Sequence, residues 1–456
     1  MINMEIVKSK QDLYRIIDDA DKQHTSNILL LMILGTIFLD AYDITILGTM
    51  TDQITKEFNL SPTMLSFVMT SLPVGALIGA IFGGTLAHRF GRKRILSISL
   101  LILIVTSLGA ALSPNIMILL ICRFLMGIAI GMDSPVAFTF IAEISNKVQR
   151  GRNVNYWQVV WYIAIVTSSL VVIAFFLMGA GETLWRMAVG FGACIALVLY
   201  IMRLKYLQES PTRIINHFSL EKATNYIQKH YDVQLMLEER QEEYQANHYE
   251  HQQSYKALLK KPYLKRLTLA TAISTLQGMQ YYAVGLYIPI IAKYMISEDK
   301  LGVLFGTAIV NIAGIIGAYL GAQYTYRLGT RKLTMIGFGI VLFVMVVTGL
   351  FYNNLPMVMN TCLIALFLFG HSGGPGTQGK TIGALSFPTH LRSQATGIVE
   401  SVSRTGSIIG TFVFPIILAT VGLNQTMLWI GLVPLIGLII TFVLKWEPVG
   451  KNVENE

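Results

Sequence analysis

The sequence is poor in charge and in cysteine. Only 13% of its 456 residues are charged, whereas a typical soluble domain carries about 25%. The three cysteines, Cys122, Cys194 and Cys362, stand alone within apolar segments, and their spacing matches neither a metal site nor an evident disulfide. The sequence contains no credible nucleophile–base pattern. We therefore expect neither an enzyme nor a protein that holds a metal or a redox cofactor.

Long apolar runs are abundant, since 53% of the residues are hydrophobic. Runs of about 18 residues or more recur from end to end, which predicts a polytopic membrane protein made of α-helices. We expect an all-α fold of twelve transmembrane helices in two six-helix bundles. The predicted spans are 27–50, 63–87, 95–113, 116–140, 153–178, 185–207, 266–294, 300–324, 332–352, 356–384, 394–421 and 423–445.

One long polar stretch, 208–265, divides the apolar runs into two sets of six. We interpret it as a cytoplasmic linker of short helices, formed by Leu220–Tyr231 and Glu238–Tyr244. The N-terminal segment contains a short amphipathic helix over Gln11–Lys22. The predicted parts are an N-terminal segment (1–26), a first bundle (27–207), the linker (208–265), a second bundle (266–446) and a C-terminal tail (447–456).

The formal charge of +9 comes from basic residues clustered in short loops on alternate connections, such as 89–94, 147–152 and 327–332. This is the distribution of the positive-inside rule. It predicts a multi-pass protein of the cell membrane with both termini in the cytoplasm. The same distribution argues against nucleic-acid binding. The expected partners are the lipid bilayer, protons and a small-molecule substrate, and we expect a monomer.

Two carboxylates lie inside the first apolar run. Asp40 and Asp43 are three residues apart, so they share one face of a helix. A carboxylate at membrane depth costs at least about 2.5–3.5 kcal/mol, and such residues usually face the interior and serve a function. We expect at least one of the pair to carry protons or to bind substrate, although a structural role or a solvated position near the outer interface is an alternative.

A loop motif of glycines and basic residues follows the second run. Its expected gating residues are Gly84, His88, Arg89, Gly91 and Arg92. A weaker copy, 327–331, follows the eighth run, so the two halves of the chain are similar. The motif and the twelve runs resemble the major facilitator superfamily, which implies a substrate site between two repeats near the midplane. His88 stands where that family usually has aspartate, which removes a carboxylate-centred latch or makes it pH-sensitive.

On the fourth run, Arg123 shares one helix stripe with Gly127 and Gly131. The glycines should let a neighbouring helix approach closely, and Asp43 is the candidate partner of the arginine. The sequence from Asp133 through Arg150 resembles the sugar-porter-like and metabolite:proton symporter branches of the superfamily. That resemblance implies that Asp43 and Asp133 couple protons and that Gln158 contacts substrate. It also implies gates, for which the expected residues are Glu143, Arg150 and Arg392. By their spacing, Glu400 and Arg404 on the eleventh run form a local ion pair that could open during gating. Leu385 replaces the acid that would match Glu143 in the second half.

Polar side chains on the seventh and tenth runs are candidates for the wall of a binding site. They are Gln277, Gln280, Tyr281, His371 and Lys380. Four glycines and a proline between Gly373 and Gly379 should break the tenth helix and free backbone groups for a ligand. Lys380 either extends to the cytoplasmic surface or faces the cavity, where it would favour an anion. Glu400 and Arg404 are four residues apart and able to pair.

These residues predict a proton-coupled symporter of a small polar metabolite, such as an aromatic or a sugar acid, that works by alternating access. Sugar uptake is the main alternative, because the glutamines suit a sugar. Phosphate is disfavoured, since no acidic residue lies within 267–294. Drug efflux by proton antiport would prefer a larger and more apolar cavity, and a non-transporting membrane sensor would not need the gating motifs.

Overall fold

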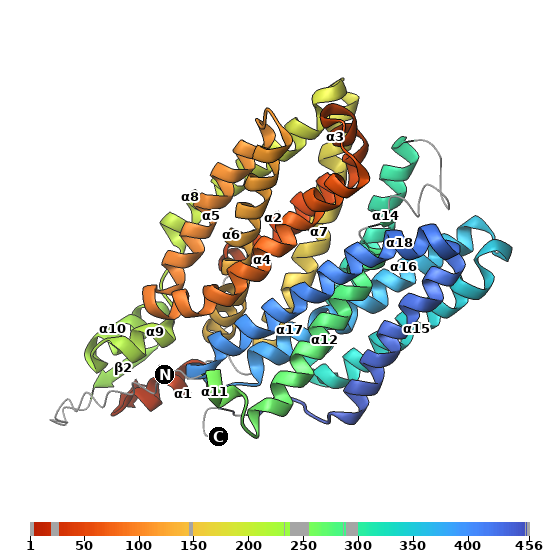
Figure 1. The fold of residues 1–456 in the computed structure, drawn as a ribbon. Coiled ribbons are helices and arrows are strands. Elements are labelled where there is room, and N and C mark those ends of the chain that lie inside the picture. The colour runs from red at the N-terminus through yellow and green to blue at the C-terminus, as the bar shows by residue number, and fades with distance from the viewer. Residues whose placement is uncertain are drawn as a thin grey trace.

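The computed structural model describes residues 4–19, 27–145, 149–231, 233–237, 255–285, 287–288, 300–451 and 453. The predicted helix at 238–244 and the end of the seventh predicted span lie outside these residues. The described chain is almost entirely helical, and the long helices form two bundles that lie side by side (Figure 1). Both chain termini lie at the same end of the bundles, which we call the termini end.

Each bundle is built from six membrane-length segments. The first contains α2 (Asn27–Thr49), α4 (Pro62–Phe90), α5 (Arg92–Ala111), α6 (Ile116–Ile144), α7 (Arg150–Leu177) and α8 (Leu184–Tyr206). The second contains α12 (Tyr263–Val284), α14 (Lys300–Leu328), α15 (Thr330–Phe351), a segment divided into α16 (Met357–Gly373) and α17 (Pro375–Leu385), and the two segments of α18 (Thr389–Val443). Short helices are α1 (Lys10–Asp19), α3 (Thr51–Phe58), α9 (Pro211–His217), α10 (Leu220–Tyr231) and α11 (Tyr255–Leu258), with 3₁₀ turns at Gly181–Thr183 and Tyr352–Asn354.

Within the described residues, eleven helical segments are long and apolar enough to cross a membrane. Two of them belong to α18, which turns at Gly422 (φ 73°) into the spans Gln394–Leu418 and Thr420–Val443. α12 occupies the place of the seventh predicted span and has 22 residues, but it is not among the eleven. Its buried polar residues, such as Gln277 and Gln280, lower the hydropathy of a helix whose length would suffice.

Two glycine-dependent features confirm what the sequence predicts of helix packing. A Cβ at Gly127 or Gly131 of α6 would lie 2.1 Å from a backbone oxygen of α4, so these glycines permit the close approach of the two helices. The tenth span is broken at Gly374 (φ −113°, ψ −110°), where α16 ends and α17 begins. The break lies within the glycine-rich tract, as expected.

The linker and the N-terminal segment form a small unit at the termini end. Strand β1 (Met4–Val7) pairs in parallel with β2 (Gln234–Leu237), and α1, α9 and α10 pack around a small apolar core. The sequence analysis expected only helices here, because four-residue strands give too short a pattern to recognise. The pairing ties the start of the chain to the linker 230 residues away.

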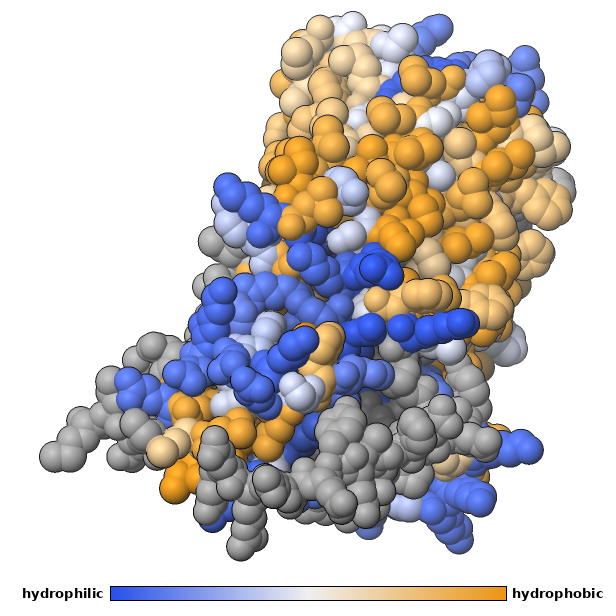
Figure 2. Space-filling model, turned by 90° about the vertical axis from the view of Figure 1, so that its left-hand side faces the viewer, coloured by the Kyte–Doolittle hydropathy of each residue, from blue (hydrophilic) through white to orange (hydrophobic). Residues whose placement is uncertain are grey.

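The outer surface of the bundles is apolar. Figure 2 shows apolar side chains over most of one face, with hydrophilic side chains gathered toward the termini end. Large apolar side chains such as Val105 on α5 (62% exposed) and Ile201 on α8 (56%) point outward. Monomeric soluble proteins rarely expose apolar patches of this extent, whereas a bilayer favours them.

Candidate functional site

A buried cavity lies where the two bundles meet. α7 packs against α14 and α17, and α4 packs against α18. The cavity receives side chains from both bundles. Its walls are Ile37, Asp40, Ser134, Trp157, Gln158, Trp161, Gln277, Tyr281, Tyr282, His371, Lys380, Glu400, Ser403, Arg404 and Ser407.

Four charged side chains meet on one wall, and we call them the charged cluster: Asp40, Lys380, Glu400 and Arg404. Lys380 Nζ lies 2.9 Å from Glu400, and the guanidinium of Arg404 lies 2.9 Å from Asp40 Oδ2 and 3.4 Å from Glu400 Oε1. All four side chains are at most 10% exposed. Two acids face two bases, so the cluster is neutral when every member is ionised.

The predicted pair Glu400–Arg404 is confirmed, and Lys380 faces the cavity instead of extending to the surface. The sequence analysis missed the bond between Asp40 and Arg404, which are 364 residues apart. This bond joins α2 of the first bundle to α18 of the second.

An aromatic and amide wall lies beside the charged cluster. The rings of Tyr281 and His371 stack at 4.9 Å, and Trp161 Nε1 donates a hydrogen bond to the hydroxyl of Tyr281 (3.1 Å). The Lys380 ammonium lies 4.4 Å from the centre of the Trp157 ring, a cation–π contact. Among the described residues, Gln158 Oε1 and His371 Nε2 have no hydrogen-bond partner, so both can bind a ligand.

Of the predicted wall residues, five line the cavity: Gln158, Gln277, Tyr281, His371 and Lys380. Gln280 lies behind His371, and its Nε2 is 3.0 Å from Nδ1 of that ring. Trp157, Trp161 and Tyr282 also belong to the wall. From the sequence alone they rank below the amides, because aromatic side chains are more often core or interface residues.

The other predicted proton-coupling residues lie outside the cavity wall. Asp43 and Arg123 are buried and close enough to interact electrostatically, but no ion pair within 4 Å joins them among the described contacts. Asp43, the candidate partner of Arg123, therefore interacts with it through space and not through a direct ion pair in this structure. Arg123 instead donates from Nε to the backbone oxygen of Val68 (3.3 Å), because its side chain extends toward α4.

Asp133 is held in a separate polar network within the first bundle. It accepts hydrogen bonds from Ser99 (2.6 Å) and from Arg203 (2.9 Å). Arg203, fully buried on α8, also donates to backbone oxygens of α2 and α5. The network therefore fastens four helices together. The sequence analysis missed Arg203, although an arginine near the end of an apolar run is a visible signal.

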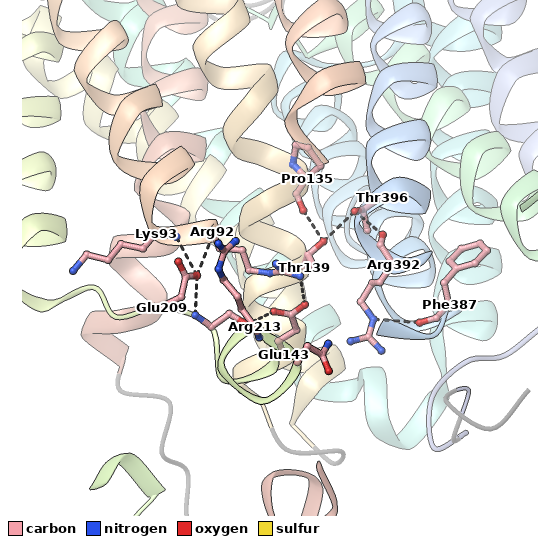
Figure 3. Close-up of polar contacts among 12 residues, drawn as sticks. Arg92, Lys93, Pro135, Thr139, Glu143, Glu209, Arg213, Phe387, Arg392 and Thr396 are labelled. Atoms are coloured by element: carbon pink, nitrogen blue, oxygen red, sulfur yellow. Dashed lines mark hydrogen bonds and ion pairs between the residues drawn. The ribbon is translucent and has the colours of Figure 1, made fainter. Parts of the chain in front are cut away.

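Three of the predicted gating residues, Arg92, Glu143 and Arg392, lie near the termini end (Figure 3). Arg92 forms an ion pair with Glu143, which also accepts a hydrogen bond from Ser210. Glu209 was not predicted, yet it accepts from the backbone N–H of Arg92 (3.0 Å). Gly91 has φ 99°, and a Cβ there would lie 2.4 Å from Glu209 Oε2, so only glycine fits this turn.

Two of the gating residues, Arg150 and Arg392, donate hydrogen bonds to backbone oxygens nearby in the chain. Arg150 donates to the backbone oxygen of Ser145 (3.2 Å), and Arg392 donates from Nε to that of Phe387 (3.2 Å). The Arg89 guanidinium lies over the Phe90 ring. Gly84 is buried on α4, and the side chain of His88 lies outside the described part of the chain.

Uncharged side chains join the bundles between the cavity and the termini end. The hydroxyls of Thr139 on α6 and Thr396 on α18 are 3.1 Å apart (Figure 3). Asn155 on α7 makes hydrogen bonds to Gln378 (3.3 Å) and Thr381 on α17 and to a threonine of α14. These contacts close the cavity toward the termini end.

A second space lies next to the cavity and shares part of its wall. It is lined by residues farther along α2, including Ile44 and Gly48, and by Thr307 and Asn311 of α14. Trp161, Tyr281 and Tyr282 line both spaces. These three rings form a partition between the cavity and the end opposite the termini.

Residues 28–455 match the family model described as "Sugar (and other) transporter". The chain belongs to this family, within the major facilitator superfamily. It is a transporter with multiple membrane-spanning helices and not an enzyme. Its fold is similar to that of XylE of Escherichia coli, a proton:xylose symporter solved with 6-bromo-6-deoxy-D-glucose, at a TM-score of 0.76 and 19% identity over 94% of this chain and 97% of XylE.

Curated members of the family differ in what they carry. The chain is 25% identical to the niacin transporter NiaP of Acinetobacter baylyi over 92% of this chain and 94% of NiaP. It is 26% identical to the arabinose-proton symporter of Bacillus subtilis over 92% of this chain and 91% of that symporter. The family therefore identifies a sugar or metabolite transporter, and the cavity chemistry has to distinguish between substrates.

Proposed function

We propose that this protein is a proton-coupled symporter of a small organic anion, such as an aromatic or a sugar acid. The observation that carries the proposal is the charged cluster in the cavity wall. Lys380 and Arg404 are buried cations whose counter-ions, Glu400 and Asp40, are side chains that can be protonated. A protonated carboxyl no longer neutralises its partner, so an anionic substrate can take its place.

The walls of the cavity favour a substrate that is small and partly planar. Trp157, Trp161 and Tyr281 offer ring faces for stacking, while Gln158 and His371 offer polar atoms without protein partners among the described residues. Binding sites of this kind combine apolar contact area with a few polar groups that fix orientation. The similarity to a niacin transporter agrees with an aromatic acid.

Protons would bind to Asp43 and Asp40 on α2, with Arg123 coupling the charge of Asp43 to its surroundings. Asp133 remains a candidate from the family resemblance, but its bonds to Ser99 and Arg203 favour a role in holding the first bundle together. Alternating access would follow from rocking of the two bundles about the cavity. The gate at the termini end would open as the uncharged contacts between the bundles separate.

We propose further that the protein lies in the cell membrane with both termini in the cytoplasm. The basic loop segments 89–94 and 327–332 lie at the termini end, as the positive-inside rule requires of a cytoplasmic face. The described conformation is then closed toward the cytoplasm.

Sugar uptake is the second candidate. Gln158 and Gln277 line the cavity and could hydrogen-bond sugar hydroxyls, and the arabinose-proton symporter is a relative. A sugar would leave the charged cluster fully paired within the protein. Competition by neutral analogues as strong as that by acids would favour this function.

The test is reconstitution of the purified protein in vesicles that contain a pH-sensitive dye. Aromatic acids, sugar acids and sugars are added in turn, and proton entry is recorded for the unmodified protein and for Asp43→Asn. We expect one class of acid to drive proton entry, and we expect no proton entry in the variant. Uptake of a sugar or an acid without proton movement, unchanged by Asp43→Asn, would contradict proton coupling.

A further inference from the structure

We infer that Arg404 is the residue that binds the carboxylate of the substrate, and that Asp40 occupies this position in the empty transporter until it takes up a proton. The inference rests on the proposed function, because it presupposes an anionic substrate. It changes the expected role of Arg404 from a gating residue to a binding residue. It also separates the task of Asp40 from that of Asp43.

The geometry of the Asp40–Arg404 ion pair would allow a substrate carboxylate to take the place of Asp40 on the guanidinium. One guanidinium nitrogen lies 2.9 Å from Asp40 Oδ2, while Asp40 Oδ1 has no hydrogen-bond partner among the described residues. Both side chains line the cavity and are at most 5% exposed. Arginine binds carboxylates best through two parallel hydrogen bonds. The single contact to Asp40 is therefore weaker than one that a free carboxylate could make.

Lys380 is less suited to this exchange. Both oxygens of Glu400 lie 2.9 Å from its Nζ, and the aromatic rings of Trp157 and Phe138 lie at 4.4 and 5.1 Å. Lys380 and Glu400 also belong to the same bundle, on α17 and α18. Asp40 is the one member of the charged cluster that comes from the first bundle. Its release breaks the ionic contact of the cluster across the two bundles.

Charge neutrality explains why proton and substrate would travel together. The empty cluster holds two negative and two positive charges. A proton on Asp40 leaves one positive charge in excess, and a monocarboxylate restores neutrality. Either event alone leaves an uncompensated charge in a buried site, which is costly. The cluster therefore takes one proton for each carboxylate.

The other charged groups around Asp40 do not neutralise Arg404 when Asp40 takes up a proton. The charged and titratable side chains that face it are Asp43 of α2, Arg123 of α6, Tyr282 of α12, and Lys380, Glu400 and Arg404 of the second bundle. Arg123 interacts with Asp43 as well as with Asp40, so its charge remains balanced when Asp40 becomes neutral. Glu400 remains bound to Lys380.

The test measures ligand binding in detergent as a function of pH. The fluorescence of Trp157 and Trp161, which line the cavity, reports binding. The probes are two matched pairs of an acid and a neutral counterpart, nicotinate with nicotinamide and glucuronate with glucose. If one proton binds with each acid, the affinity of the unmodified protein for the acid falls about tenfold per pH unit once Asp40 is ionised in the empty protein. The affinity for the neutral counterpart does not change.

Two variants test the two roles. Asp40→Asn mimics the protonated carboxyl, so acid binding becomes independent of pH and acid exchange persists. Arg404→Lys keeps the positive charge and the fold but loses the two-pronged contact, so the affinity for acid falls at least about tenfold while that for the neutral counterpart stays. Glu57→Gln is the matched control, because its ion pair with Arg186 lies outside the cavity, and it leaves acid binding unchanged.

The outcomes separate this inference from the proposed function. Acid binding by Asp40→Asn that keeps the pH dependence of the unmodified protein overturns the inference and leaves symport intact. An equal fall in the affinities of Arg404→Lys for the acid and for its neutral counterpart would also overturn the inference and leave symport intact. This second result can be obtained even if Asp40→Asn does not fold. If the unmodified protein neither binds an acid nor moves protons with one, the proposed function fails and the inference fails with it.

Discussion

The two bundles use the same cap at the termini end. In the first, Glu209 accepts a hydrogen bond from the backbone of Arg92 at the start of α5 (3.0 Å). In the second, Glu447 accepts one from the backbone of Arg331 at the start of α15 (2.9 Å). A glycine with positive φ precedes each helix, with φ 99° in the first bundle and 81° in the second. A Cβ on either glycine would lie 2.4–2.5 Å from the capping carboxylate.

The bundles differ in the charge that they add to this cap. The first places the buried Arg92 against Glu143 of α6 (Figure 3). The corresponding positions of the second bundle, 238 and 242 residues further along, hold Thr330 and Leu385. The cap therefore serves the backbone, which both halves share, whereas the ion pair is a specialisation of the first half. Among the described residues, a buried ion pair at these positions is therefore present in the first half and replaced by Thr330 and Leu385 in the second.

The largest expected effect comes from giving the first bundle the residue of the second. Glu143→Leu removes the ion-pair partner of the buried Arg92 and the acceptor of the Ser210 hydroxyl. Removing one member of a buried ion pair costs about 3–5 kcal/mol, so we expect a clear fall in the thermal unfolding temperature in detergent. Leu385→Met in the second bundle is the control and should cost less than about 1.5 kcal/mol. Equal losses would mean that Glu143 contributes packing and no latch.

An intermediate effect is expected from weakening the shared cap. Glu209→Gln and Glu447→Gln each remove the charge of a carboxylate that holds the first N–H groups of a helix. Loss of such a cap costs about 1 kcal/mol. We expect the free energy of unfolding to fall by a similar amount in the two variants. Backbone hydrogen exchange should become faster at Arg92 in Glu209→Gln and at Arg331 in Glu447→Gln. A loss confined to the Glu209 variant would show that the cap, like the ion pair, matters in the first half alone.

The sequence predicts those parts of the fold that depend on local composition. The apolar runs locate the long helices, and the glycine tract locates the break at Gly374. Boundaries are less well predicted, since α4 and α6 continue to Phe90 and Ile144, past the ends of their apolar runs. Hydropathy does not record the extra turns, because they lie where the helix has left the apolar layer.

The sequence predicts which residues belong to the site, but it does not predict which of them form ion pairs with one another. Asp40 and Arg404 are both conspicuous as charges in apolar runs, yet their bond depends on how α2 lies against α18. The same holds for Asp133 and Arg203, which are 70 residues apart. A local pair such as Glu400–Arg404 follows from helical spacing. Partners on different helices require the packing of the bundles, which no short pattern encodes.

The smallest effect should come from the contact between the hydroxyls of Thr139 and Thr396, to which neither bundle contributes a charge. The Thr139 and Thr396 hydroxyls also lie 2.8 and 2.9 Å from backbone oxygens of their own helices. Each hydroxyl has one proton, so a cross-bundle hydrogen bond competes with a bond inside the helix. We therefore expect Thr396→Val to cost at most about 0.5–1.5 kcal/mol.

A loss of this free energy at the bundle contact would shift the equilibrium toward separated bundles by up to about tenfold. It would not cause the loss of stability expected of Glu143→Leu. The measurement is the rate at which a thiol reagent labels a cysteine introduced at Thr381, in an otherwise cysteine-free protein with and without Thr396→Val. Faster labelling at an unchanged unfolding temperature would assign closure at the termini end to uncharged contacts and stability to the ion pair of the first bundle. An unfolding temperature of Thr396→Val as low as that of Glu143→Leu would contradict this assignment. The hydroxyl pair would then stabilise the fold as much as the buried ion pair does.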